Sequence, residues 1–271
     1  MYPEIVIFGY PIATYGLLSV LGGVAVILYV YFTNRGGRAG RLPGGDLLNL
    51  LCLALAGIFI GGKLLGLITM IPVAVRNWAF IATGFMNVLG VLFSTFVFYG
   101  GLLGALFAIY LYCRRYKISR RLTFGLVTPA IPLFHSIARI GCFLAGCCYG
   151  VEVPWGMELN ASHVAPHHVH LMPVQLFESA FNLLLFIALA VLSRRLVQKW
   201  RVLPIYFLAY GSGRFVLEFF RGDAIRGHFW AFSTSQWISL LLIAAAIVML
   251  IKYRKNPVTP AEPSAHPADD Q

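Results

Sequence analysis

The segment from His135 to Gly150, HSIARIGCFLAGCCYG, combines residue types that can carry chemistry. Arg139 lies within an apolar stretch, and a cation at the depth of a lipid bilayer costs a few kcal/mol, so it usually has a functional partner. His135, Arg139 and Cys142 share one helix face by their spacing. A hydrogen-bonded core histidine is the simpler interpretation of His135.

A second set of charges lies in YGSGRFVLEFFRGD, where Arg214, Glu218 and Arg221 are spaced i, i+4 and i+7. This spacing predicts that the three side chains stack on one helix face. One interpretation is an internal ion pair, with Arg221 reaching water. The other is an anion site in which Glu218 holds Arg214 and the guanidinium groups bind a phosphate. We favour the anion site, because three charges exceed what one structural pair needs.

Other polar residues in apolar surroundings have two interpretations each. Gln175 and Glu178 lie near the start of a hydrophobic segment. One interpretation is a helix start, where an acidic side chain is stabilising. The other is a polar contact with a cavity. Tyr99 precedes Gly100–Gly101, which indicates helix packing through glycine or a site residue. Tyr15 is either hydrogen-bonded within the helix bundle or part of the site.

The cysteines lie at positions 52, 113, 142, 147 and 148. Their odd number and mostly apolar surroundings do not suggest a disulfide framework. Cys142, Cys147 and Cys148 suggest a metal site, but no C-x-x-C pair occurs, and adjacent cysteines are poorly spaced for one tetrahedral ion. We therefore expect no metal and no cofactor.

The elements that position these residues are predicted to be membrane helices. The 271 residues are 59% hydrophobic and 11% charged, with a mean hydropathy of +0.78, which is too apolar for a soluble protein of this length. We predict an all-α integral membrane protein with about seven transmembrane helices. Their ranges are 11–32, 47–71, 88–112, 122–144, 174–192, 203–220 and 234–253.

The basic residues orient these helices. Fifteen of the 21 fall in the loops after the first, third and fifth predicted spans and in the tail after the seventh. The positive-inside rule therefore places the N-terminus outside and the C-terminus in the cytoplasm. Because topology accounts for the charge of +11, we expect no nucleic-acid partner.

The chain is expected to form one membrane-embedded domain over residues 1–255, with an outer loop at 145–173. The tail at 256–271 is rich in Pro, Ala and acidic residues, so we expect it to be disordered. The segment 72–87 is too short and mixed to cross the bilayer and is predicted to lie at the interface or to re-enter.

Several motifs resemble those of the prolipoprotein diacylglyceryl transferases. RIGCFLAGCCYG stands where that family has R-x-G-N-F-x-N-G-E, and PVQLFE is similar to its H-P-S-Q-L-Y-E. YGSGRFVLEFFRGD and the early TYG also fit. The resemblance covers most of the membrane-embedded chain.

The resemblance implies transfer of the diacylglyceryl group of phosphatidylglycerol, or a related anionic phospholipid, to the lipobox cysteine thiol of an exported preprolipoprotein. It implies a thioether product, release of glycerol phosphate, and a site toward the outer leaflet of the bacterial cytoplasmic (inner) membrane. Arg139 and Arg214 match the family's essential arginines. Tyr15 matches its tyrosine in the first span, Glu218 its acid in the sixth, and Gly150 the glycine that ends its signature.

The chain departs from the family at supporting polar positions. Tyr99 stands where the family commonly has a His before Gly-Gly, and Lys63 replaces the arginine of the second span. Cys142 and Cys147 replace the Asn and Glu of the signature, and Met172 replaces a His. The lipid-binding cations are thus kept, while much of the supporting polar shell differs from that of the family.

The predicted site has Arg139 and Arg214 stabilising the leaving phosphate, with Tyr99 or His135 relaying the thiol proton. The residues predicted to bind substrate are Tyr15, Lys63, Cys142, Gly150, Gln175, Glu178, Glu218 and Arg221. Three alternatives stay open at this point. They are a lipid-dependent transferase with a non-lipoprotein acceptor, a transporter or flippase for an anionic solute or lipid, and a thiol-redox protein using Cys147 and Cys148.

Overall fold

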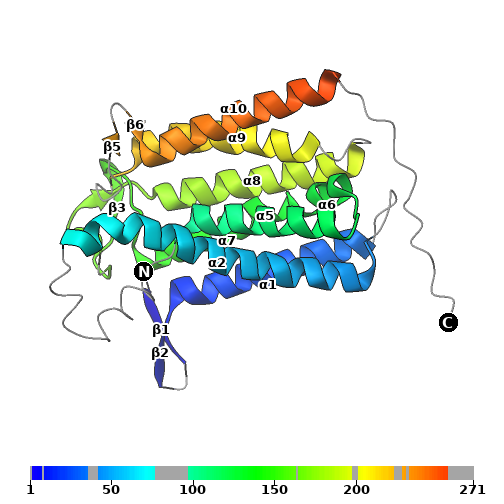
Figure 1. Cartoon of the computed structure of the whole chain (residues 1–271). Helices are drawn as coiled ribbons and strands as arrows, with labels where there is room; N and C mark the ends of the chain where they lie inside the picture. Colours follow the sequence, from blue (N-terminus) through cyan, green and yellow to red (C-terminus); the bar gives the residue numbers. More distant parts are fainter. Residues whose placement is uncertain are drawn as a thin grey trace. The chain divides into compact units, whose positions relative to one another are not determined.

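The structure is a computed structural model (Figure 1), and it describes residues 2–7, 9–35, 42–76, 97–162, 164–196, 201–222, 228–229 and 232–255. The chain divides into two compact units. One comprises Met1–Gly40 and Arg121–Gln271, and the other comprises Arg41–Arg120. The elements are mainly helices, with three short two-stranded antiparallel sheets among the described residues.

The first unit carries most of the helices. They are α1 (Thr14–Arg35), α6 (Arg120–Val127, at the unit boundary), α7 (Ala130–Ala145), α8 (Val174–Arg195), α9 (Val202–Leu217), the 3-10 turn η2 (Glu218–Phe220) and α10 (Thr234–Lys255). Its paired strands are β1 (Glu4–Ile7) with β2 (Tyr10–Ala13), β3 (Glu152–Glu158) with β4 (His170–Leu171), and β5 (His228–Phe229) with β6 (Phe232–Ser233). Within this unit α7 packs against α1 and α8, and α9 packs against α8 and α10 (Figure 1).

Apolar residues of α8 and α9 form a buried core. Its members are Leu185, Leu189, Val202, Leu203, Tyr206 and Tyr210. The Tyr206 and Tyr210 rings are stacked, with their centroids 5.4 Å apart. This packing holds α8 and α9 together, so that polar side chains from their other turns can face each other.

The helix α7 ends where the signature segment begins to turn. Gly146 has a φ of +71°, in the left-handed region that glycine adopts without steric cost. A Cβ at this position would overlap the Ser162 side chain, whose hydroxyl donates to the Gly146 carbonyl over 2.9 Å. Gly146 therefore ends the helix four residues after Cys142 and turns the chain into the Cys147–Cys148 pair.

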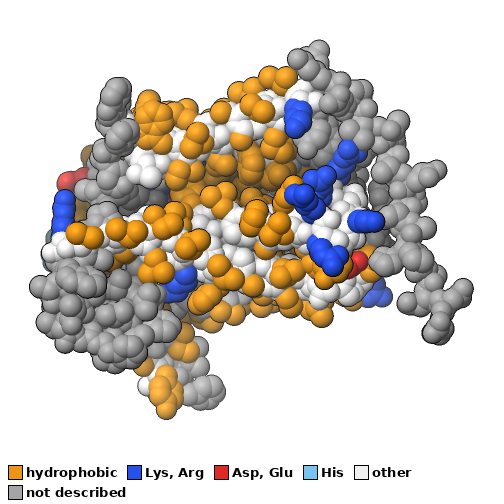
Figure 2. Space-filling view, viewed as in Figure 1, with side chains coloured by type: hydrophobic (Ala, Val, Ile, Leu, Met, Phe, Trp, Pro, Cys, Tyr) orange, Lys and Arg blue, Asp and Glu red, His pale blue; other side chains and the backbone are white. Residues whose placement is uncertain are grey.

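Five helical stretches are long and apolar enough to cross a membrane, counting only the described residues. They are Thr14–Arg35, Gly44–Ile71, Arg120–Ala145, Val174–Arg195 and Thr234–Lys252. Hydrophobic side chains are spread along the visible surface of the described helices (Figure 2). These features confirm the predicted all-α membrane class, while the count of seven spans and the placement of the termini stay predictions.

Two further predicted spans coincide with shorter helices, and one of the five long stretches is interrupted. The predicted span 203–220 corresponds to α9, which ends at Leu217, and 88–112 overlaps α5 (Phe98–Arg115). The predicted span 122–144 is interrupted between α6 and α7 at Thr128–Pro129. Proline lacks the N–H that a continuous helix needs at this point, which accounts for the break.

The second unit is a pair of helices, α2 (Gly44–Arg76) and α5, which touch through glycine. A Cβ at Gly57 would lie 2.5 Å from the Gly104 carbonyl oxygen, and Gly61 and Gly100 meet in the same way. This close backbone contact is the small-residue packing of membrane helices. It confirms the structural interpretation of Gly100, next to Tyr99.

Some predictions lie partly or wholly beyond the described residues. The helix α2 continues to Arg76, so residues 72–76 are helical rather than part of a separate segment, and 77–87 lie outside the description. The tail at 256–271 also lies outside it. The predicted outer loop at 145–173 contains the β3–β4 hairpin.

Candidate active site

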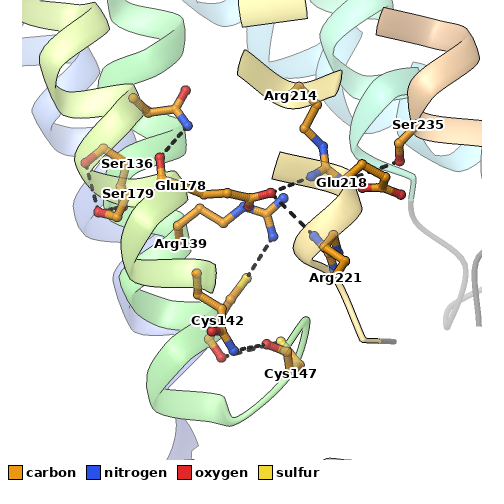
Figure 3. Close-up of polar contacts among 12 residues, drawn as sticks. Ser136, Arg139, Cys142, Cys147, Glu178, Ser179, Arg214, Glu218, Arg221 and Ser235 are labelled. Atoms are coloured by element: carbon orange, nitrogen blue, oxygen red, sulfur yellow. Dashed lines mark hydrogen bonds and ion pairs between the residues drawn. The ribbon is translucent and has the colours of Figure 1, made fainter. Parts of the chain in front are cut away.

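Glu178 of α8 lies at the centre of a buried group of charged side chains (Figure 3). Its Oε2 pairs with Nε of Arg139 from α7, and its Oε1 lies 2.5 Å from Nη1 of Arg214 from α9. Nη1 of Arg221 lies 3.6 Å from the same Oε1. No side chain in this group is more than 10% exposed. We call these four residues and Glu218 the arginine–carboxylate cluster.

Glu218, at the start of η2, supplies the second carboxylate. Its Oε2 lies 2.5 Å from Nη2 of Arg214, so the predicted Arg214–Glu218 ion pair is present. The Ser233 hydroxyl donates to Oε1 of Glu218 over 2.8 Å, and Nη2 of Arg214 donates to the Ser235 hydroxyl over 3.4 Å. Arg214 is thus fixed from both sides, which pre-orients its guanidinium group.

Arg221 reaches the cluster by a route that differs from the prediction. The helix α9 ends at Leu217, and Arg221 has an extended backbone, so it does not share the helix face of Arg214. Residues 220–222 instead form backbone hydrogen bonds with residues 149–151. This pairing replaces the helical hydrogen bonds beyond η2. The alternative in which Arg221 extends to water is also wrong, because its side chain is 3% exposed.

Gly150 permits this backbone pairing. Its N–H donates to the Met172 carbonyl over 3.0 Å, and it forms a bridge with Arg221. A Cβ at Gly150 would lie 2.6 Å from the Met172 carbonyl oxygen and 2.9 Å from that of Phe220. Only glycine therefore fits between these two segments, and its place in the site is to let the chain carrying Arg221 approach.

A polar stripe along α8 faces the cluster. Gln175 and Glu178 lie on the first turns of this helix, and Nε2 of Gln175 donates to the Cys147 carbonyl over 2.8 Å. The Ser179 hydroxyl donates to the Ser136 carbonyl over 2.9 Å, and Nδ2 of Asn182 donates to the Glu178 carbonyl over 2.7 Å. Glu178 thus makes ion-pair contacts within the bundle, and its predicted contact with a cavity stays a prediction.

Sequence reasoning missed several of these polar residues. The missed residues are Ser136, Ser179, Asn182, Ser233 and Ser235. The spacing i, i+3, i+4 and i+7 of Gln175, Glu178, Ser179 and Asn182 in an otherwise apolar helix would have indicated a single polar face. Ser233 ends β6 and Ser235 lies in the first turn of α10, and neither carried a comparable signal.

His135 lies within α7, and Tyr15 of α1 packs against the same helix. His135 is buried one turn before Arg139, and its ring centroid lies 5.5 Å from that of Tyr210. Tyr15 of α1 packs beside Gly141, where a Cβ would lie 3.3 Å from the Tyr15 Cα. Both residues therefore lie within the unit that holds the cluster, and their predicted roles stay predictions.

Lys63 and Tyr99 belong to the second unit, on α2 and α5. Nζ of Lys63 lies 6.0 Å from the centroid of the Phe59 ring. Tyr99 is half-buried, next to the glycine contact described above. Their predicted functions, in lipid binding and proton relay, stay predictions.

Three cysteine thiols gather at the end of α7. The Sγ atoms of Cys142, Cys147 and Cys148 all lie within 4.8 Å of one another. Nη1 of Arg139 lies 3.9 Å from Sγ of Cys142. Cys148 has a φ of +60°, a left-handed conformation that costs a residue with a side chain about 1–2 kcal/mol. Its pKa is lowered by hydrogen bonds from the other two thiols, and Arg139 and Arg221 act in the same direction.

The chain matches known proteins over most of its length. The family model for prolipoprotein diacylglyceryl transferase matches residues 3–252. A phosphatidylglycerol–prolipoprotein diacylglyceryl transferase of Clostridium tetani is 35% identical over 92% of this chain and 97% of its own.

Other relatives agree with this match. A second such transferase, from Clostridium perfringens, is 33% identical over 90% of this chain and 91% of its own. One from Nitrosomonas europaea is 29% identical over 87% of this chain and 84% of its own. The chain therefore belongs to the prolipoprotein diacylglyceryl transferase family.

Proposed function

We propose that this protein transfers the diacylglyceryl group of phosphatidylglycerol to the lipobox cysteine thiol of an exported preprolipoprotein. The products are a thioether-linked lipoprotein and glycerol phosphate. The family and the names of the relatives support this reaction. The protein acts in the bacterial cytoplasmic (inner) membrane, with its site toward the outer leaflet.

The main observation in support of the proposal is the set of contacts made by the Arg139 guanidinium group. Its Nε pairs with Glu178, and among the described residues its Nη groups have only the weak acceptor Sγ of Cys142. A guanidinium group offers five N–H donors in a planar fork that matches phosphate oxygens. Glu178 thus orients the guanidinium group of Arg139 through Nε, and N–H donors of the Nη groups stay available to an anionic headgroup.

The chemical step requires stabilisation of a leaving phosphate. The acceptor sulfur, as thiolate, attacks the glyceryl carbon, the bond from that carbon to the phosphate oxygen breaks, and the electron pair leaves with glycerol phosphate. Arg139 and Arg214 stabilise the charge that develops on the phosphate, and Glu178 holds both in place before the reaction. Fixed charges of this kind lower the barrier because they need no reorganisation.

The thiol must also lose its proton before it attacks. Tyr99 or His135 is proposed to relay this proton. Tyr15, Lys63, Gln175, Gly150 and Cys142 are proposed to bind or position the two substrates.

The experiment measures transfer of a labelled diacylglyceryl group to a lipobox peptide in proteoliposomes. Arg139→Ala and Arg214→Ala are expected to lower transfer by about 10²–10³-fold, as for loss of one transition-state donor. Arg195→Ala is the matched control, because Arg195 is exposed at the end of α8. Near wild-type transfer by both site variants, at equal membrane expression, would refute the proposal. A peptide with Ser in place of the lipobox Cys should accept nothing.

A further inference from the structure

The reaction proposed above uses Cys142 only as a substrate contact, and it gives no role to Cys147 or Cys148 or to the three-thiol cluster that these residues form together. All five cysteines of the chain are thiols rather than disulfides. Three of them place their sulfur atoms within 4.8 Å of one another, at the edge of the arginine–carboxylate cluster. Thiol groups gathered in this way are ligands for soft metal ions.

The sulfur positions fit a single ion. With zinc–sulfur bonds of about 2.3 Å, tetrahedral geometry places two sulfur ligands about 3.8 Å apart. The observed separations of up to 4.8 Å are close to this value, so small side-chain rotations bring the sulfurs to it. The positive φ of Cys148 is what lets two adjacent residues direct their sulfurs to one point. This backbone feature removes the spacing argument against a metal.

The surrounding residues hold this loop in place. The Cys147 N–H donates to the Cys142 carbonyl over 3.1 Å, and Nε2 of Gln175 donates to the Cys147 carbonyl over 2.8 Å. Nη1 of Arg139, 3.9 Å from Sγ of Cys142, is placed to donate to a metal-bound thiolate. Hydrogen bonds to the ligands and their backbone are typical of built metal sites.

The cluster supplies three ligands and leaves the fourth position of a tetrahedral ion open. Among the described residues no further His, Cys, Asp or Glu joins the three. Three protein ligands with an open position are typical of zinc sites that bind a substrate, whereas structural sites have four. The open position suits a soft ligand, and the acceptor of the proposed reaction is a thiol.

We propose that Cys142, Cys147 and Cys148 bind a soft divalent metal ion such as Zn²⁺, whose fourth position takes the thiol of the acceptor peptide. The choice of acceptor rests on the proposed function. On binding, the acceptor sulfur replaces a water molecule on the ion, and its proton passes to solvent. No atom changes its oxidation state. The ion keeps the acceptor as a thiolate beside Arg139, ready for attack on the lipid.

The first experiment measures metal binding by the purified full-length, reduced protein. Equilibrium dialysis with Zn²⁺, and with Co²⁺ as a spectroscopic probe, should give one ion per chain and sulfur-to-cobalt charge-transfer absorption. Cys142→Ser, Cys147→Ser and Cys148→Ser should each weaken binding at least tenfold. Cys52→Ser and Cys113→Ser are the matched controls and should bind like wild type. Fewer than half an ion per chain for the reduced wild type, or unchanged binding by the triple serine variant, would overturn the site.

The second experiment tests the fourth ligand without turnover. A lipobox peptide added to the Co²⁺-loaded protein, with no phosphatidylglycerol present, should intensify the charge-transfer bands, and the peptide with Ser should not. Equal spectra with both peptides would overturn the acceptor's place on the ion.

Alkylation and mass spectrometry of anaerobically isolated protein supply a check that needs no variant. Chelator-reversible protection of three thiols supports the site, and a disulfide between two of them contradicts it.

These readouts require no transfer of lipid. A protein that transfers the diacylglyceryl group but binds no ion would overturn only this inference. A protein that binds the ion but transfers nothing would overturn only the proposed function.

Discussion

The α2–α5 pair and the α7–α9 group pack their helices with different residues. The pair touches through backbone at Gly57, Gly61, Gly100 and Gly104, which suits helices in lipid where contact alone is needed. The α7–α9 group instead buries the arginine–carboxylate cluster, although helices can pack against each other without buried charges. Buried charges are costly, so the described cluster in this group of helices is where we propose that a charged ligand binds.

The largest effect is expected from Glu178→Gln. This change leaves the buried guanidinium groups of Arg139 and Arg214 without their shared carboxylate, and loss of one partner of a buried pair costs about 3–5 kcal/mol. Thermal unfolding in detergent should show this loss, and transfer should fall below detection. Glu158→Gln is the control, because that side chain is 39% exposed and its loss should change stability by less than about 0.5 kcal/mol. Equal stability of the two variants would remove Glu178 from the centre of the site.

The next effect concerns Gly150→Ala. The added Cβ would lie 2.6 Å from the Met172 carbonyl oxygen, so the segment that carries Arg221 must shift. A displacement of about 1 Å in a site can cost about 10²-fold in rate, which is the fall in transfer we expect. The control is Gly23→Ala in α1, where a Cβ meets nothing within 4 Å and transfer should be unchanged. Similar activity of the two variants would contradict the positioning account of Gly150.

The α2–α5 pair is tested by Gly57→Ala. The new Cβ would lie 2.5 Å from the Gly104 carbonyl oxygen, so the two helices must separate. Overpacking of this kind costs about 1–3 kcal/mol, which thermal unfolding should detect. We expect a smaller loss of stability than for Glu178→Gln. The opposite order would contradict the contrast between the two regions.

The smallest effect is expected from Ser179→Ala. It removes a buried hydrogen bond to the Ser136 carbonyl, and such bonds contribute about 0.5–1.5 kcal/mol. Thermal unfolding should show a loss in this range, with transfer reduced less than twofold. A loss of transfer as large as that of Arg139→Ala would place Ser179 among the residues that act on substrate.

Local pattern predicted part of the arginine–carboxylate cluster. Arg139 and Arg214 were expected from charge at membrane depth, and the pairing of Arg214 with Glu218 followed from helical spacing. The class of fold followed from composition, because apolar stretches of about 20 residues have the length of a transmembrane helix.

The remaining features depend on contacts between distant segments. Arg221 leaves the helix because residues 220–222 pair with 149–151, a pairing that no local period encodes. Glu178 pairs with two arginines only because α7, α8 and α9 pack together. Sequence spacing alone identifies it only as a polar residue near the start of a helix. The thiol cluster needs the positive φ of Cys148, which its residue type does not predict.

Binding of phosphatidylglycerol tests the central claim most directly. Purified wild-type protein and the variants Arg139→Gln and Arg214→Gln would be titrated with phosphatidylglycerol and with zwitterionic phosphatidylcholine, and lipid binding followed by native mass spectrometry. The buried guanidinium groups predict that wild type prefers phosphatidylglycerol at least tenfold and that each variant loses this preference. Equal binding of the two lipids by wild type, or an unchanged preference in both variants, would contradict an anion site at Arg139 and Arg214.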